Sequence, residues 1–190
     1  MRKIAYLISI AAFPLLAANT ARATDGTINF TGSVVASTCK INGGVNDQTV
    51  ALSAISTNQL AQAGATGRRT AFKLELTGCA ADKPEGETTI PAPVKKVAVE
   101  FENGANVNTA TGRLKLVGTD AAKNVEIEIL NDKLEPIKIG ADRGSQNSQA
   151  VDIDTTTGKA TLQYAAQYVA TDAATAGTAN SFVTYSLMYP

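Results

Sequence analysis

Short runs in which apolar and polar side chains alternate recur along the chain between residues 72 and 189. A period of two places every second side chain on the same face of an extended strand, where it can be buried. The apolar members of these runs are Phe72, Leu74 and Leu76; Val97, Val99 and Phe101; Leu114 and Leu116; Val125, Ile127 and Ile129; Leu162, Tyr164, Ala166 and Tyr168; and Val183, Tyr185, Leu187 and Tyr189. Clusters rich in Gly, Asn, Asp and Thr separate the runs, and these residues favour turns. The chain is therefore predicted to form one all-β domain, a sandwich or a barrel.

Two stretches depart from this pattern. Residues 56–63 form the only helix-like patch, and Gly64 ends it. Residues 81–93 are polar and contain three prolines and a glycine. We expect this second stretch to be a long loop within the domain, because neither half of the chain has enough predicted strands to form a sandwich alone.

The first 23 residues predict an export signal. The basic pair Arg2-Lys3 precedes an apolar run over residues 4–18, and Ala21-Arg22-Ala23 matches an A-x-A cleavage site. The apolar run is short for a bilayer span of ~20 residues, so cleavage is favoured over a retained anchor. No other stretch is apolar enough to span a membrane. Cleavage after Ala23 would leave 167 of the 190 residues, enough for one domain.

The charge of the mature chain bears on its partners. The signal contains three of the 17 basic residues and no acidic residue, so 14 basic and 17 acidic residues remain and the net charge is −3. Phosphate backbones are bound by clusters of Lys and Arg, and the basic residues here are scattered. Nucleic acid is therefore excluded as a partner.

Cys39 and Cys79 are the only cysteines. In an exported chain a single pair favours one disulfide, although two buried free thiols are the alternative. A bridge closing this 41-residue loop would stabilise the fold by about 4 kcal/mol. The chain has no histidine and no third cysteine. It therefore lacks the ligands of a typical zinc site, and no metal or other cofactor is predicted.

No catalytic residue is predicted either. Without histidine, neither a Ser-His-Asp triad nor a Cys-His pair can form. Glu126 and Glu128 are two carboxylates with the spacing of one strand face, and we expect them to line its solvent side rather than act as an acid–base pair. Asp152 and Asp154 are too few for a calcium loop and are also expected to face solvent.

The segment that follows the cleavage site, residues 24–35, contains a second kind of alternation. Ile28, Phe30, Gly32 and Val34 share one parity, so an extended chain presents them on one face. Gly32 leaves a gap in this apolar row, which suits a shallow place in a receiving groove. The alternation alone is equally consistent with an ordinary first strand that contains a glycine bulge.

The two ends of the chain and its cysteines together resemble the chaperone–usher pilins of the type 1 family. The matching features are the Ile-x-Phe-x-Gly-x-Val-Val segment at 28–35 followed by Cys39, the 40-residue spacing to Cys79, the stretch from Leu162 to Thr171, Gly177 as the fourteenth residue from the end, and Tyr189 as the penultimate residue. The resemblance covers essentially the whole mature chain, and Gly177 with Tyr189 is the pair of positions that usually identifies this family.

The resemblance implies an incomplete immunoglobulin-like β-sandwich, completed by a donor strand from the neighbouring subunit. Residues 24–35 would be the donor-strand extension and residues 36–190 the pilin domain. The acceptor groove would lie beside the C-terminal strand, at Val183, Tyr185, Leu187 and Tyr189. The implied partners are a periplasmic chaperone, an outer-membrane usher and identical or related subunits in a head-to-tail polymer.

The resemblance therefore predicts an exported structural subunit of a fimbria on the bacterial surface, which supports cell adhesion. A minor adaptor or tip pilin and a stand-alone secreted carbohydrate-binding β-sandwich are the alternatives. The chain has no Trp and only five Tyr and five Phe, which disfavours an aromatic sugar-binding platform. The sequence departs from the usual pattern in its short extension and in Pro190, which follows Tyr189 and leaves the anchoring of the terminus on the chaperone open.

Overall fold

A computed structural model of the chain describes residues 28–31, 39–79, 81, 83–90, 92 and 94–190. The chain divides into two compact units, one up to Val34 and one from Val35. In the first unit, residues 28–31 form neither helix nor strand, and the side chains of Ile28 and Phe30 are exposed. The predicted signal peptide, Gly32 and Val34 lie outside the described residues.

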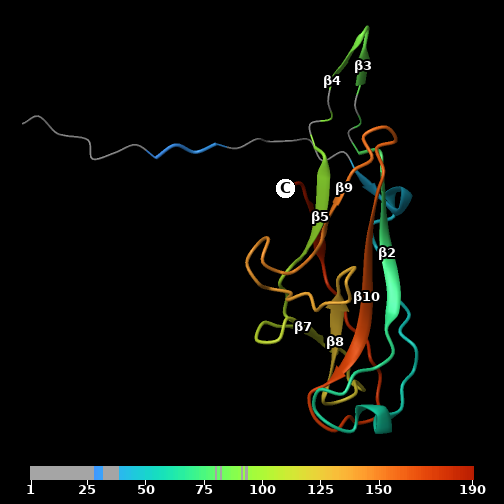
Figure 1. The fold of residues 1–190 in the computed structure, drawn as a ribbon. Helices are drawn as coiled ribbons and strands as arrows, with labels where there is room; N and C mark the ends of the chain where they lie inside the picture. Colours follow the sequence, from blue (N-terminus) through green and yellow to red (C-terminus); the bar gives the residue numbers. More distant parts are fainter. Residues whose placement is uncertain (1–27, 32–38, 80, 82, 91, 93) are drawn as a thin grey trace, which may run out of the picture. The chain divides into compact units, whose positions relative to one another are not determined.

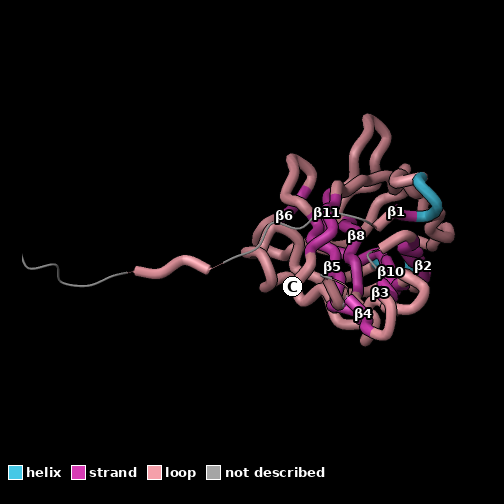
Figure 2. Tube along the Cα trace, turned by 90° about the horizontal axis from the view of Figure 1, so that it is seen from above, coloured by secondary structure: helices cyan, strands magenta, loops and turns pink. Residues whose placement is uncertain are grey.

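The second unit is all-β, as predicted, and its strands form two main sheets (Figure 1). One sheet has six strands in the order β1-β2-β10-β8-β7-β6, and the other has three in the order β11-β5-β9. The elements are β1 Lys40–Ile41, η1 Asn42–Gly44, η2 Thr57–Leu60, β2 Thr70–Thr77, β3 Lys83–Glu85, β4 Thr88–Ile90, β5 Lys96–Phe101, β6 Val107–Asn108, β7 Arg113–Lys115, β8 Val125–Leu130, β9 Ala150–Asp152, β10 Ala160–Ala170 and β11 Tyr185–Met188. Figure 2 shows the strands gathered at the centre of the unit, with the loops around them.

Strand β10 organises the larger sheet. It is the longest strand and pairs antiparallel with β2 on one side and with β8 on the other. The alternation predicted for β2 is confirmed: Leu74 and Leu76 are buried, whereas Lys73 and Glu75 are exposed. The inward side chains of β2, β8 and β10 meet those of β5 in one hydrophobic core.

The two stretches that depart from the strand pattern both contain short elements. The helix-like patch is a single 3-10 turn, η2, and the side chain of Ser56 caps its start by accepting a hydrogen bond from the Asn58 N–H. The predicted loop at 81–93 contains the β3–β4 hairpin, whose strands pair only with each other in the described structure. This hairpin extends beyond the two main sheets (Figure 1).

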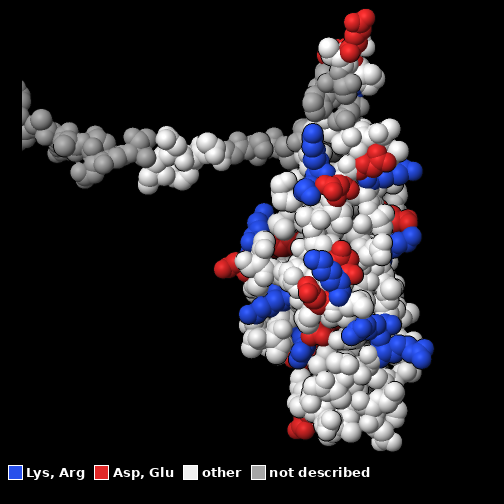
Figure 3. Space-filling model, in the orientation of Figure 1, with Lys and Arg blue, Asp and Glu red and all other residues white. Residues whose placement is uncertain are grey.

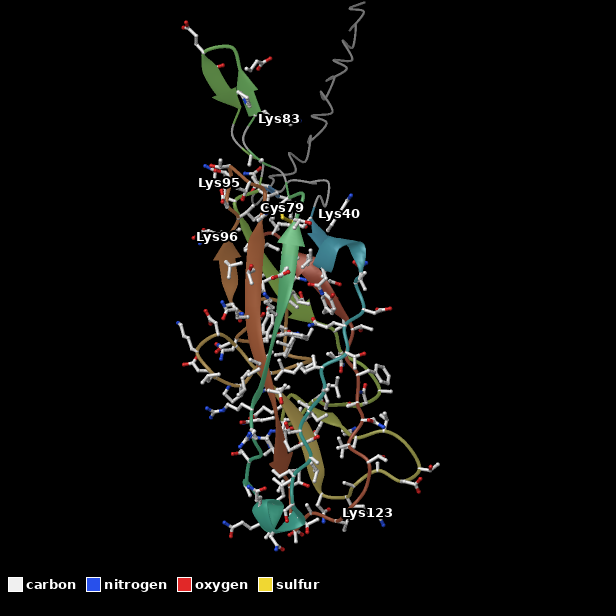
Figure 4. The ribbon with its side chains drawn as sticks, turned by 90° about the vertical axis from the view of Figure 1, so that its right-hand side faces the viewer. Lys40, Cys79, Lys83, Lys95, Lys96 and Lys123 are labelled. Carbon is white, nitrogen blue, oxygen red and sulfur yellow. A yellow bond between two sulfur atoms is a disulfide. The ribbon has the colours of Figure 1, made fainter. Side chains whose placement is uncertain are left out.

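Cys39 and Cys79 form a disulfide, which confirms the prediction and rules out the alternative of free thiols. The bond lies where β1 pairs with the end of β2, because Lys40 is opposite Thr77. Figure 4 shows Cys79 at this end of β2, with Lys40 nearby. The Cys79 N–H donates to the Gly158 carbonyl over 3.0 Å, so the disulfide is also tied to the turn before β10.

The prediction that Glu126 and Glu128 face solvent is wrong. Their exposed fractions are 7% and 5%, because side chains from neighbouring strands cover them on the outer face of the six-stranded sheet. Glu128 accepts hydrogen bonds from Arg113 Nε over 2.9 Å and from Gln167 Nε2 over 2.7 Å. Glu126 accepts one from Asn108 Nδ2 over 2.7 Å. These carboxylates therefore join strands and are not a solvated face.

Asp152 and Asp154, in contrast, are exposed as predicted. Asp152 forms an ion pair with Lys96 over 3.0 Å. On the face shown in Figure 3, positive and negative side chains are interspersed, without a patch of a single sign.

Candidate strand-acceptor groove

An open groove of about 870 Å³ runs between two chain segments of the second unit. One wall is formed by residues 46–54 and the other by residues 177–185. The floor consists of side chains from the hydrophobic core: Phe72, Leu74, Phe101, Leu114, Ile127, Ile129, Ala166 and Tyr168. Between these two walls, part of the hydrophobic core borders an opening to solvent, and an apolar ligand bound there would cover it.

The first wall, residues 46–54, is a strand-like segment without a partner. Within the described part of the chain, residues 47–54 make no backbone hydrogen bond. Val50 and Leu52 are half-buried and alternate with exposed neighbours. The sequence reasoning missed this wall, although the alternation of Val50, Leu52 and Ala54 could have indicated it.

The second wall leads into β11, which lies at the end of its sheet and, among the described residues, pairs only with β5. Thr184 faces Glu102, and its carbonyl accepts the Glu102 N–H over 2.8 Å. In an antiparallel ladder the residues that bond to the partner strand alternate with residues whose N–H and C=O point away from it. Tyr185 and Leu187 therefore direct their backbone polar groups away from β5, toward the open edge.

The ladder on the other side of β5 agrees with this register. Phe101, opposite Tyr185, turns its backbone away from β11. Its N–H donates to Gln146 Oε1 over 3.0 Å, and its carbonyl accepts from Gln146 Nε2 over 2.8 Å. The hydrogen bonds on both sides of β5 therefore agree on the register that directs the backbone groups of Tyr185 toward the open edge.

Gly177 allows the second wall to approach the loop at 120–122. Thr178 pairs in parallel with Ala121, and the Thr178 N–H donates to the Asp120 carbonyl over 2.7 Å. A Cβ atom on Gly177 would lie 2.6 Å from the Asp120 carbonyl oxygen and 2.8 Å from the Ala121 carbonyl carbon. No side chain fits there, which gives a steric reason for glycine at the position that the resemblance singled out.

Tyr185 connects the two walls. Its hydroxyl donates a hydrogen bond to the Asn46 carbonyl over 2.6 Å. Burial, with a smaller contribution from the negative charge of Asp47, raises the pKa of Tyr185 above its usual value. The hydroxyl therefore keeps its proton, and the bond, throughout the neutral pH range.

The groove contains part of the predicted acceptor set. Val183 and Tyr185 line it, whereas Leu187 and Tyr189 are not among its lining residues and are partly buried against the core. Of the predicted donor residues, Ile28 and Phe30 are exposed. In the described part of the chain, no helix has both the length and the apolar character needed to cross a membrane.

The fold resembles that of pilus subunits. A chain in the structure of a chaperone–usher pilus superposes with a TM-score of 0.57 at 18% identity, over 88% of this chain and 96% of that chain. Pilus subunits have an incomplete immunoglobulin-like fold, so the predicted fold class is confirmed.

The sequence matches fimbrial proteins over nearly its whole length. The family described as "Type-1 fimbrial protein, A" matches residues 52–190. The major fimbrial subunit SMF-1 of Stenotrophomonas maltophilia (strain K279a) is 41% identical, over 95% of this chain and 99% of the relative. The F17 fimbrial protein of Escherichia coli is 36% identical, over 100% of this chain and 99% of the relative. The chain therefore belongs to the type-1 fimbrial protein family, as a structural subunit of an exported surface fimbria.

Proposed function

We propose that this subunit polymerises by donor-strand exchange, in which its groove accepts the N-terminal extension of another copy. The observation that supports this most directly is that the groove has an apolar floor and a wall that runs directly into the open edge of β11. A strand placed between residues 46–54 and β11 would bond to the outward backbone groups and cover the floor. Strand addition of this kind satisfies main-chain hydrogen bonds and fills side-chain pockets together.

The extension has side chains that suit the groove. Ile28, Phe30 and Val34 share one face of an extended chain, so all three can point toward the floor. Burying each of them would stabilise the contact by ~1.5–3 kcal/mol before the loss of entropy is counted. Gly32, in the same row, would allow the backbone to come close. Because the extension and the groove are different surfaces, the contact is head-to-tail and produces a fibre.

The same proposal assigns the parts of the chain and its partners. Residues 1–23 are the signal peptide, residues 24–35 the donor extension and residues 36–190 the pilin domain. A subunit with an open apolar groove needs protection before assembly, because such a groove and edge invite aggregation. A periplasmic chaperone and an outer-membrane usher would supply this protection and delivery.

We further propose that the role of the subunit is structural and not enzymatic. Relatives of this chain bear the names of major fimbrial subunits, which favours a repeating shaft subunit over a minor adaptor or tip pilin. Membership of the fimbrial family also disfavours the stand-alone carbohydrate-binding sandwich.

Two proteins test strand acceptance. One contains residues 36–190, and the other carries residues 24–35 appended to its C-terminus through a flexible linker. We expect the second to remain a monomer and to unfold at a markedly higher temperature than the first, which should aggregate more readily; circular dichroism and size-exclusion chromatography would measure both. A third protein, with Phe30→Arg in the appended segment, is the matched control, because a buried unpaired charge is strongly unfavourable. Equal stability of all three proteins would contradict the proposal.

A further inference from the structure

A hydrogen bond joins the two walls of the groove at one end. Asn46 is the first lining residue of its wall, and Tyr185 is the last lining residue of the opposite wall. The Tyr185 hydroxyl donates to the Asn46 carbonyl oxygen over 2.6 Å, so the bond spans the gap between the walls. The donor is a side chain and the acceptor belongs to the backbone of the first wall. The bond therefore lasts only while residue 46 stays close to β11.

The edge of β11 continues beyond this bridge. Leu187 also directs its N–H and C=O away from β5, yet it is not a lining residue of the groove. A donated strand that ended at the bridge would leave these two groups without a partner in the finished contact. Unpaired strand edges are prone to wrong pairing, and buried polar groups without partners are unfavourable. A strand that covers the whole of β11 must therefore displace the bridge.

We propose that the bridge between Tyr185 and Asn46 is a gate, closed in the free subunit and opened by the incoming donor strand. The inference rests on the proposed strand acceptance and adds a positioning residue to it. Tyr185 determines how far along β11 a strand can pair before the walls separate. In the closed state, part of the β11 edge is shielded from unrelated strands. The closed state also lowers the fraction of subunits able to bind, and so it slows and weakens strand uptake.

The test uses the full exported chain with Phe30→Arg, so that its own extension does not fill a groove. A fluorescent peptide of residues 24–35 is added, and its association is followed by fluorescence anisotropy. Adding Tyr185→Phe removes only the hydroxyl. We expect the peptide to associate about fivefold faster and to bind with a Kd about fivefold lower, because a typical intramolecular hydrogen bond no longer has to be broken.

Tyr164→Phe is the matched control for this experiment. Tyr164 is not among the lining residues of the groove, and its hydroxyl lies 3.3 Å from Ser148 Oγ. Removing that hydroxyl should leave both the rate and the Kd of peptide binding unchanged. Equal acceleration by the two substitutions would assign the effect to a general loosening of the domain and overturn the gate.

Thermal unfolding provides a second, independent measurement. If the bridge exists only in the free subunit, Tyr185→Phe lowers the unfolding midpoint without peptide and leaves the midpoint of the peptide complex unchanged. An equal loss in both states would mean that the bridge persists in the complex, and the gate would be wrong. Unchanged or slower association in the Tyr185→Phe variant would also overturn it. If the peptide bound to none of the variants, strand acceptance itself would fail, and the gate with it.

Discussion

At the scale of single residues, Tyr164 connects the two sheets through its ring. It stacks on Phe72 at a centroid distance of 5.5 Å and meets the edge of Phe101 at 5.4 Å. Its hydroxyl lies 3.3 Å from Ser148 Oγ. Burial raises the pKa of Tyr164 to about 12, although the contact with Ser148 lowers it. The inward position predicted from alternation is confirmed by an exposed fraction of 3%.

This shift predicts a loss of stability at alkaline pH. Because the pKa in the folded state lies above the value of 10 for an unfolded tyrosine, its contribution is complete below pH 10 and is lost as the pH rises toward 12. By pH 11 we expect a loss on the order of 1 kcal/mol in the free energy of unfolding. Denaturant titrations of the strand-completed subunit between pH 8 and 11 would measure it, with pH values chosen at roughly one-unit steps.

The matching variant for this prediction is Tyr164→Phe, which cannot ionise. Its free energy of unfolding should differ from that of the parent by a constant below pH 10, and should fall less steeply above it. Parallel profiles over the whole range would contradict the assigned cause.

At the scale of elements, the position of the second groove wall depends on the close approach at Gly177. A Cβ at this position would collide with backbone atoms of the loop at 120–122, which cannot rotate away as a side chain can. Gly177→Ala should therefore lower the free energy of unfolding of the strand-completed subunit by ~1–3 kcal/mol, as overpacking does. The same shift of the wall should weaken binding of the donor peptide.

Gly104→Ala is the control for that substitution. The Cβ it adds meets only the Asn106 side chain, at an ordinary contact distance of 3.5 Å. Its effect should stay within about 0.5 kcal/mol in a denaturant titration. If Gly177→Ala were as harmless as this control, the steric account of the signature glycine would have to be abandoned.

At the scale of the whole molecule, the proposed mechanism predicts that one side chain of the extension decides whether fibres form. An exported subunit with Phe30→Arg should fold around a supplied donor peptide but form no fibres by itself, because every extension would carry a charge into an apolar groove. Electron microscopy of the assembled material would detect this. Asn29→Arg adds the same charge on the opposite face of the extension, and it should leave fibre formation intact. Fibres from the Phe30→Arg chain would show that Phe30 does not enter the groove.

Much of this fold and part of the site could be predicted from the sequence. Alternation located the inward side chains of β2 and β10, because strand periodicity is a local property of the chain. The pairing of Cys39 with Cys79 followed from there being only two cysteines in an exported chain. The family followed from short motifs in a fixed order, and with it the region of the C-terminal strand.

Only the tertiary structure decided which distant segments became neighbours. Glu128 is buried because Arg113 and Gln167 reach it from other strands, and nothing in its own run indicates those partners. The groove brings residues 46–54 next to residues 177–185. The bridge across it joins Tyr185 and Asn46, which are 139 positions apart in the sequence. Burial and hydrogen bonding depend on such contacts, so the sequence determined the strands and the family, whereas folding determined the groove and how it is closed.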